Sequence, residues 1–92
     1  MKSIVQRRKE CYFCHRREGL HEHHIFEGKG RRQLSEKYGL KVYLCGRHHN
    51  LSNNSVHRQQ DMREMLYREG QRAFERSYPQ LDFLEVFSIR FL

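Results

Sequence analysis

The clearest periodic pattern of apolar and polar positions lies between residues 59 and 78. The apolar residues of this segment recur close to the helical period: Met62, Met65, Leu66, Ala73 and Phe74. Glu64 and Arg68 stand at positions i and i+4, where opposite charges meet on a helix surface. The segment therefore predicts an amphipathic helix. Its interior Gly70 costs about 1 kcal/mol relative to alanine, so the helix is expected to depend on the packing of its apolar face or to bend there.

The N-terminal half predicts short strands around a short helix. Residues 20–26 have the pattern of an extended segment, and residues 41–44 have the β-branched and aromatic content of a second strand. Residues 31–38 predict a helix between the two strands, ended by Gly39. A further helix is expected to begin at Gly46. Together with the C-terminal helix, these elements predict an α+β fold.

The last segment follows the only proline, Pro79, which suits the first turn of a final helix. Its apolar residues are expected to pack on the preceding helix: Leu81, Phe83, Leu84, Phe87 and Ile89. The alternative is a homodimer surface, because the end of so small a protein carries a large apolar load. That load comprises Phe83, Phe87, Phe91 and Leu92. We favour the core.

Chain length and cysteine number limit the class of protein. The chain has 92 residues, enough for one domain, 1–92, whose modest core a metal crosslink would support. Its 3 cysteines, without a secretory signal, favour a metal site in a reducing compartment over a disulfide framework. No apolar run approaches the ~20 residues that span a bilayer. We therefore expect a cytoplasmic protein without a membrane segment.

The formal net charge of +7 favours a polyanionic partner, and the charge is unevenly distributed. Most of the excess lies in two basic blocks, residues 1–17 and 29–47. Nucleic acid, with DNA expected, is the partner that fits this pattern best. The expected contacts with its backbone, which would weaken steeply with salt, are Lys29, Arg31, Arg32 and Arg47.

Two half-sites of matching spacing predict a structural zinc ion. They are Cys11-x2-Cys14 and Cys45-x2-His48, each able to chelate one ion through a tight turn. Zinc suits three thiolates and one imidazole because it accepts tetrahedral geometry and has no redox chemistry. His15 and His49 compete for the fourth position, but only His48 reproduces the spacing of the first half-site.

A second group of histidines follows the first half-site. In an extended segment, His21 and His23 share one face and His24 takes the opposite face. A hydrolytic nuclease needs a base to deprotonate water and a cation to neutralise charge on the phosphate, and histidine suits the first task. For His15 and His21 a surface or packing role is expected. For His23, His24 and His49 we favour chemistry.

These motifs together resemble the HNH endonuclease family in its zinc-ribbon-bearing form. The shared features are Cys-x2-Cys, then His-His-Ile, then Leu-Cys-x2-His-His, and they span residues 11–57. The resemblance extends to small phage-type HNH proteins such as the RecA-dependent recombination-enhancement nucleases. It implies a zinc-stapled ββα-metal core over residues 11–57, followed by a C-terminal helical extension over residues 58–92.

The resemblance also implies roles for single residues. In the family, a metal-binding residue directly precedes the general-base histidine, and this pair falls on His23 and His24. The last motif residue, which binds the catalytic ion, matches His49 or its neighbour Asn50, and we favour His49. His57 is a further candidate ligand of the same ion.

The chain departs from the family pattern in two ways. The middle asparagine is missing, since residues 39–41 are Gly-Leu-Lys, and Asn50 or Asn53 is the possible substitute. His23 replaces the usual aspartate, so the catalytic ion is expected to be Mn²⁺, Co²⁺, Ni²⁺ or Zn²⁺ in preference to Mg²⁺. We therefore expect weak activation by magnesium.

The sequence thus predicts a metal-dependent endonuclease that hydrolyses phosphodiester bonds of nucleic acid. It would use His24 as general base and one catalytic divalent ion beside the structural zinc. The alternative is a non-catalytic zinc module that binds nucleic acid or protein, which would need the cysteines but not His24. A second copy of the chain, or a recombination or packaging protein, is a possible partner, and a phage origin would place the protein in the host cytoplasm.

Overall fold

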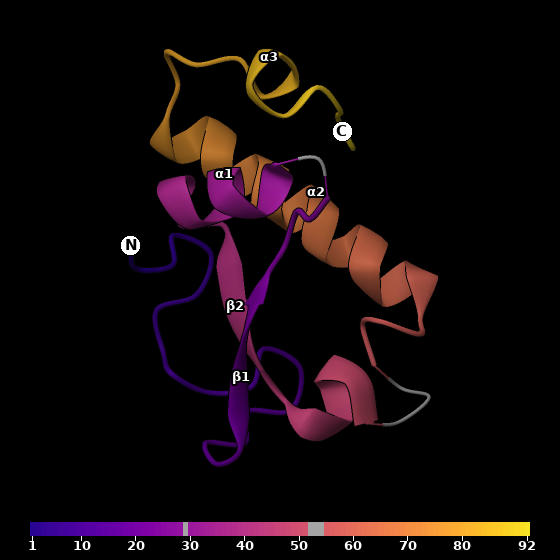
Figure 1. The fold of residues 1–92 in the computed structure, drawn as a ribbon. Helices are drawn as coiled ribbons and strands as arrows, with labels where there is room; N and C mark the ends of the chain where they lie inside the picture. Colours follow the sequence, from indigo (N-terminus) through magenta and orange to yellow (C-terminus); the bar gives the residue numbers. More distant parts are fainter. Residues whose placement is uncertain (29, 52–54) are drawn as a thin grey trace.

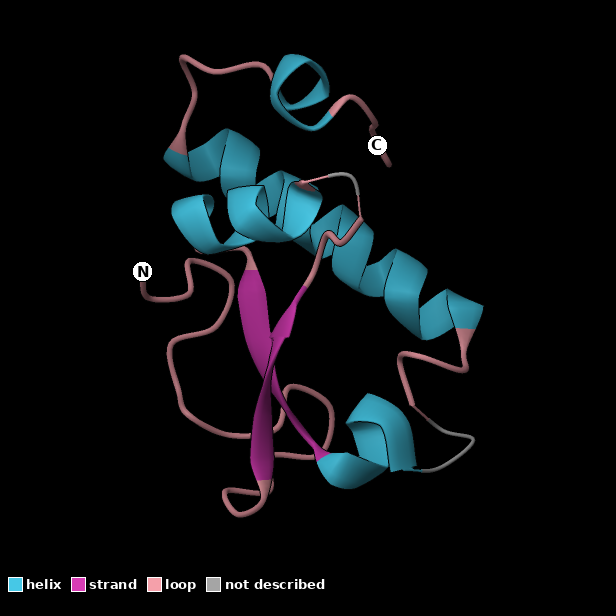
Figure 2. Cartoon of the chain, in the orientation of Figure 1, coloured by secondary structure: helices cyan, strands magenta, loops and turns pink. Residues whose placement is uncertain are grey.

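The computed structural model describes residues 1–28, 30–51 and 55–92, and of residues 50 and 51 it describes only the backbone. The elements follow one another along the chain as shown in Figures 1 and 2: β1 (Leu20–His24), α1 (Arg31–Tyr38), β2 (Lys41–Cys45), η1 (Arg47–Leu51), α2 (Gln60–Ser77) and α3 (Phe83–Phe87). These helices and one small sheet confirm the predicted α+β class. Among the described residues, no helix has the length and apolar character needed to cross a bilayer.

Strands β1 and β2 form a two-stranded antiparallel sheet in which His23 pairs with Val42 and His24 with Lys41. Helix α1 connects the two strands and lies across one end of the sheet, while η1 continues from the other end of β2 (Figure 1). Gly39 ends α1 with φ of 73°. A side chain at this position would collide with the backbone of Lys2, so glycine is required both for the turn and for the close approach.

The amphipathic helix predicted over residues 59–78 is α2, which buries Leu66, Ala73 and Phe74. Its Gly70 faces the ring of Phe26, and a Cβ added there would lie 3.0 Å from two ring carbons. A side chain at this position would therefore crowd Phe26, a contact that the sequence did not predict. α2 belongs to the same apolar cluster as the two strands and α3, so one core serves the whole described chain.

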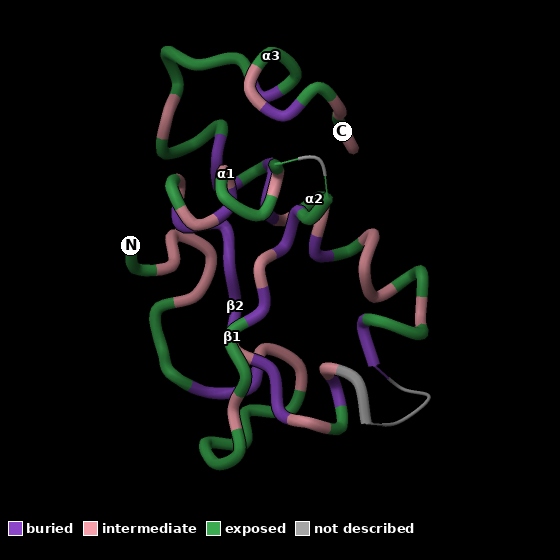
Figure 3. The backbone as a smooth tube through the Cα atoms, viewed as in Figure 1, coloured by how far each residue is buried: buried purple, intermediate pink, exposed green. Residues whose placement is uncertain are grey.

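The final helix begins later than predicted from Pro79. α3 starts at Phe83, because the Asp82 side chain accepts a hydrogen bond from the backbone N–H of Leu84 at 3.2 Å and caps the helix there. Phe83 and Phe87 are fully buried, which confirms their predicted place in the core, whereas Leu92 is 45% exposed. Figure 3 shows buried stretches in β2, α2 and α3, whereas most of β1 is exposed or half-buried.

Candidate metal centres

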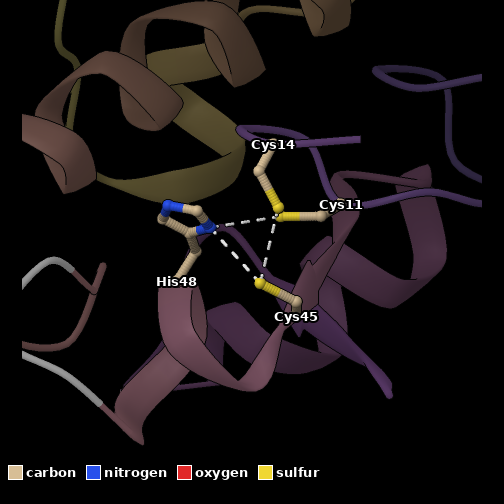
Figure 4. Close-up of side chains that lie close together, drawn as sticks. All are labelled: Cys11, Cys14, Cys45 and His48. Carbon is tan, nitrogen blue, oxygen red and sulfur yellow. Dashed lines mark hydrogen bonds between the residues drawn. The ribbon is translucent and has the colours of Figure 1, made fainter. Parts of the chain in front are cut away.

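Cys11, Cys14, Cys45 and His48 lie together at the end of the sheet where β2 enters η1, and they could hold a metal ion such as zinc. The Sγ atoms of Cys14 and Cys45 are 3.7 Å apart, and Nδ1 of His48 is 3.6 Å from Sγ of Cys11 and 3.3 Å from Sγ of Cys45 (Figure 4). Tetrahedral zinc with ordinary bond lengths separates two sulfurs by about 3.8 Å and a sulfur from a nitrogen by about 3.5 Å. The four side chains therefore fit such an ion.

Local hydrogen bonds hold the first half-site in place. The N–H of His15 donates to the carbonyl of Cys11 at 2.9 Å, which closes the turn, and the N–H of Tyr12 donates to the carbonyl of Tyr43 in β2 at 2.9 Å. Burial of the Cys11 thiol opposes its ionisation, but backbone hydrogen bonds from Cys45, Cys14 and Phe13 lower its pKa to about 6. A thiolate at neutral pH is the form that binds metal.

His48 is the fourth member of this group, as its spacing from Cys45 predicted. His15 does not join the four residues: its Nδ1 lies 2.7 Å from a carboxylate oxygen of Glu10. His49, the next residue on η1, belongs to a different group. Successive residues of one helical turn thus serve two separate centres.

His23, His49 and His57 form the second group, in which one ring nitrogen from each lies within 4.8 Å of the others. They come from β1, η1 and the turn before α2. The Nε2 atoms of His49 and His57 are 3.1 Å apart. The N–H of Val56 donates to the carbonyl of His48 at 2.9 Å, and this bond returns the chain to η1 so that His57 meets His49. The structure therefore brings together three predicted ligands of one catalytic ion.

The environment of this three-histidine cluster favours neutral imidazoles. His23 is only 6% exposed, and burial, with His49, His57 and His24 nearby, lowers its pKa to about 3. Burial, with His57 and His21 nearby, also lowers the pKa of His49. Nδ1 of His23 is buried without a hydrogen-bond partner among the described residues. Neutral rings with an unsatisfied nitrogen suit a cation, which would restore the missing interaction.

His21 joins the edge of this cluster, although a surface or packing role was expected for it. Its Nδ1 lies 2.9 Å from Nδ1 of His49, and the two ring centroids are 5.0 Å apart. The signal was present in the sequence, because an extended segment places His21 on the same face as His23. What the sequence lacked was the position of His49.

His24 lies on the opposite face of β1 from His23, as the strand alternation predicted, and it does not join the three-histidine cluster. Its Nε2 is 2.8 Å from a carboxylate oxygen of Glu36 in α1. Lys41 donates to Glu36 at 3.0 Å and to Glu22 at 3.2 Å. The terminal ammonium, His24 and Lys41 together hold the pKa of Glu36 well below its usual range. His24, Glu22 and Glu36 also lie close enough to hold a metal ion, but the Lys41 ammonium already contacts both carboxylates and the terminal ammonium contacts Glu36.

The predicted nucleic-acid contacts occupy different environments. Arg31 is half-buried and donates from Nε to the carbonyl of Phe87 at 2.9 Å, which is a structural contact within the core. Arg32 and Arg47 are exposed, on α1 and η1. Lys29, the side chain of Asn50 and Asn53 lie outside the described residues.

Comparisons of the chain with protein-family models, with curated proteins and with solved structures found no match.

Proposed function

We propose that the protein is an HNH-type endonuclease that hydrolyses phosphodiester bonds of nucleic acid, with DNA as the expected substrate. The observation that carries this proposal is the convergence of His23, His49 and His57 beside a separate four-residue group of metal-ligand type. Two antiparallel strands followed by η1 supply His23, Cys45, His48 and His49, an order that is consistent with a ββα-metal core, while the N-terminal loop supplies Cys11 and Cys14 and the turn before α2 supplies His57. The four-residue group fixes η1 against the N-terminal loop and so holds His49 in position.

A divalent ion bound by His23, His49 and His57 would neutralise charge that develops on the scissile phosphate. Three neutral imidazoles favour Mn²⁺, Co²⁺, Ni²⁺ or Zn²⁺ over Mg²⁺, which prefers oxygen ligands. His21, which lies next to this cluster, supports His49 through the contact between their Nδ1 atoms. The three ligands come from separate parts of the chain, so each one is held in place by different local contacts.

The family resemblance assigns the general base of this proposal to His24, which the structure pairs with Glu36 on the opposite face of β1 from His23. A carboxylate 2.8 Å from Nε2 orients the imidazole and stabilises the imidazolium that forms when His24 accepts a proton. This leaves Nδ1 to take the proton from a water molecule. The resulting hydroxide attacks phosphorus in line, the bond to the 3′ oxygen breaks, and the product carries a 5′ phosphate.

A second candidate function is a non-catalytic zinc module that binds nucleic acid. The position of His24 favours it, because His24 faces away from the three-histidine cluster and pairs with Glu36 instead. In such a module the cysteines would still be required to bind zinc. The contact between His24 and Glu36 would contribute to stability alone. The two functions make opposite predictions for a His24 variant.

Nicking of supercoiled plasmid DNA by the zinc-loaded protein tests the proposal. Reactions contain Mg²⁺, Mn²⁺, Co²⁺, Ni²⁺ or a chelator, and compare wild type with His24→Ala and His49→Ala. His15→Ala is the matched control, since it removes another histidine paired with a glutamate, at 2.7 Å, outside the cluster. We expect nicking by wild type and His15→Ala only. Absence of nicking by zinc-loaded wild type with every ion would favour the binding module, and nicking by His24→Ala at the wild-type rate would remove His24 as the base.

A further inference from the structure

A pocket of about 600 Å³ opens beside the four-residue group, and its lining includes Cys45 of that group and His21, which contacts His49 of the three-histidine cluster. Its lining includes Arg16, Gly19, His21, Gly46 and Arg47, with Glu18 as the one carboxylate. The pocket lies between the first half-site of the four-residue group, the start of β1 and the start of η1. The two guanidinium groups in this lining outnumber its one carboxylate, so its arginine side suits an anionic occupant.

Arg16 is the basic residue of this pocket that the sequence argument did not assign. Its side chain is exposed and forms no ion pair with the described residues. Its backbone is fixed, because its carbonyl accepts a hydrogen bond from the N–H of Cys11 at 2.8 Å. The fixed backbone holds the base of the Arg16 side chain beside the pocket and the four-residue group. This arrangement suits the recognition of a phosphate, for which guanidinium geometry is well matched.

His21 links the pocket to the three-histidine cluster. It lines the pocket, and its Nδ1 also lies 2.9 Å from Nδ1 of His49. If Nε2 of His49, the atom 3.1 Å from His57, is the ligand atom, then Nδ1 of His49 carries the proton and donates to His21. When Nδ1 of His21 accepts this hydrogen bond, the ring hydrogen of His21 is on Nε2. That N–H is then available to an anion in the pocket.

We propose that this pocket holds a phosphate of the nucleic-acid strand next to the one that is cleaved, with Arg16 and His21 as its donors. The inference rests on the proposed nuclease function and adds a substrate-binding position to it. In this position His21 is a positioning residue: it holds the orientation of His49 and contacts the neighbouring phosphate. Arg16 contributes to binding alone.

Binding and cleavage are measured separately to test this. Fluorescence anisotropy follows a labelled DNA duplex and zinc-loaded protein without added divalent ion, for wild type, Arg16→Ala, His21→Ala and His21→Asn. Arg90→Ala is the matched control, an exposed arginine removed with the same change of charge at the C-terminal end of the chain. We expect Arg16→Ala to weaken binding about 10-fold and to reduce the salt slope by about 1, as loss of one phosphate contact requires. Arg90→Ala should leave the slope unchanged.

Cobalt binding provides the second measurement. The absorption of Co²⁺ added to zinc-loaded protein reports occupancy of the three-histidine cluster. We expect His21→Ala to weaken Co²⁺ binding by 10-fold or more, as loss of a hydrogen bond to a ligand histidine typically does, at roughly 10–100-fold. His21→Asn, which can still accept and donate, should recover part of the loss, and Arg16→Ala should have no effect.

The outcomes separate this inference from the proposed function. Equal DNA affinity and equal salt slope for Arg16→Ala and Arg90→Ala would overturn the phosphate position, whether or not the protein cleaves DNA. Equal Co²⁺ affinity for wild type and His21→Ala would overturn the positioning role of His21. Conversely, a protein that binds DNA through Arg16 but nicks no plasmid would retain the pocket as a phosphate site and lose the nuclease function.

Discussion

The Nε2 atoms of His49 and His57 lie 3.1 Å apart, although the two residues are 8 positions apart on separate elements. Two neutral imidazoles can approach this closely when one donates a proton to the other or when both bind the same cation. His23 reaches the same point from β1, with its ring centroid 5.4 Å from each of the other two. Nδ1 of His23 is buried without a hydrogen-bond partner among the described residues, so a cation shared by the three rings explains the group better than hydrogen bonding alone.

A first prediction concerns the affinity of this cluster for metal. His57→Ala should weaken the binding of Co²⁺ or Mn²⁺ to zinc-loaded protein by more than about 10-fold, since a ligand matters at least as much as its supporting partners. Isothermal titration measures the affinity. His15→Ala, which leaves all three rings in place, should bind as wild type does. If His57→Ala and wild type bind with the same affinity, the cluster is not a metal site.

A second prediction concerns the four-residue group. A chain of this size has a stability of about 5–14 kcal/mol, whereas structural zinc supplies about 10–16 kcal/mol in small zinc domains. Strong chelators, or the substitution Cys45→Ser, should therefore unfold the protein, as measured by circular dichroism and zinc content. His57→Ala should keep one zinc per chain and remain folded. A chelated protein with the spectrum and melting temperature of the zinc-loaded form would contradict a structural metal.

The elements of this fold were predictable from local patterns, while the partners of the histidines were only partly so. The boundaries of α2 followed from the periodicity of its apolar residues, and His48 followed from its spacing to Cys45. The predicted start of α3 was wrong. Pro79 favours a first helical turn at its own position, but the helix begins after Asp82, whose side chain caps it. The sequence pattern alone does not show which of these two local signals determines the start of the helix.

Tertiary contacts explain the remaining differences. The pairing of His24 with Glu36 depends on α1 folding back across the end of the sheet, which no spacing along the chain specifies. The contact of His21 with His49 depends on where η1 leaves β2. Strand alternation predicted correctly which histidines share a face of β1. It could not predict which residues from other parts of the chain contact them there.

A third prediction uses the buried position of His23. Its pKa is about 3 in the folded protein, compared with an ordinary value near 6.5, so below pH 6.5 the unfolded state binds more protons than the folded state. The contribution of neutral His23 to stability is complete above pH 6.5 and is lost as pH falls toward 3. The slope approaches about 1.4 kcal/mol per pH unit. Urea unfolding of wild type and His23→Gln between pH 4.5 and 6.5, without added second metal, measures the difference.

The variant is needed because acid also protonates the cysteine ligands, which affects both proteins equally. We expect the wild type to lose stability more steeply with acid than His23→Gln does. Parallel stability curves for the two proteins would show that His23 is protonated as easily in the folded state as in the unfolded state. In that case the site around it would be open to water.

A fourth prediction tests the contact between α2 and the segment that follows β1. Gly70→Ala removes the helix penalty of glycine, worth about 1 kcal/mol, but places a methyl group 3.0 Å from the ring of Phe26. Phe26 is fully buried and also contacts Phe83 and Phe87, with ring centroids 5.2 and 5.0 Å away, so it has little room to move. Overpacking of this kind costs about 1–3 kcal/mol. Urea unfolding should therefore show a net loss of stability for Gly70→Ala, while Ser77→Ala at the exposed end of the same helix should show none. A more stable Gly70→Ala protein would mean that Phe26 can shift, and that the C-terminal helices are packed less tightly on the strands than the structure indicates.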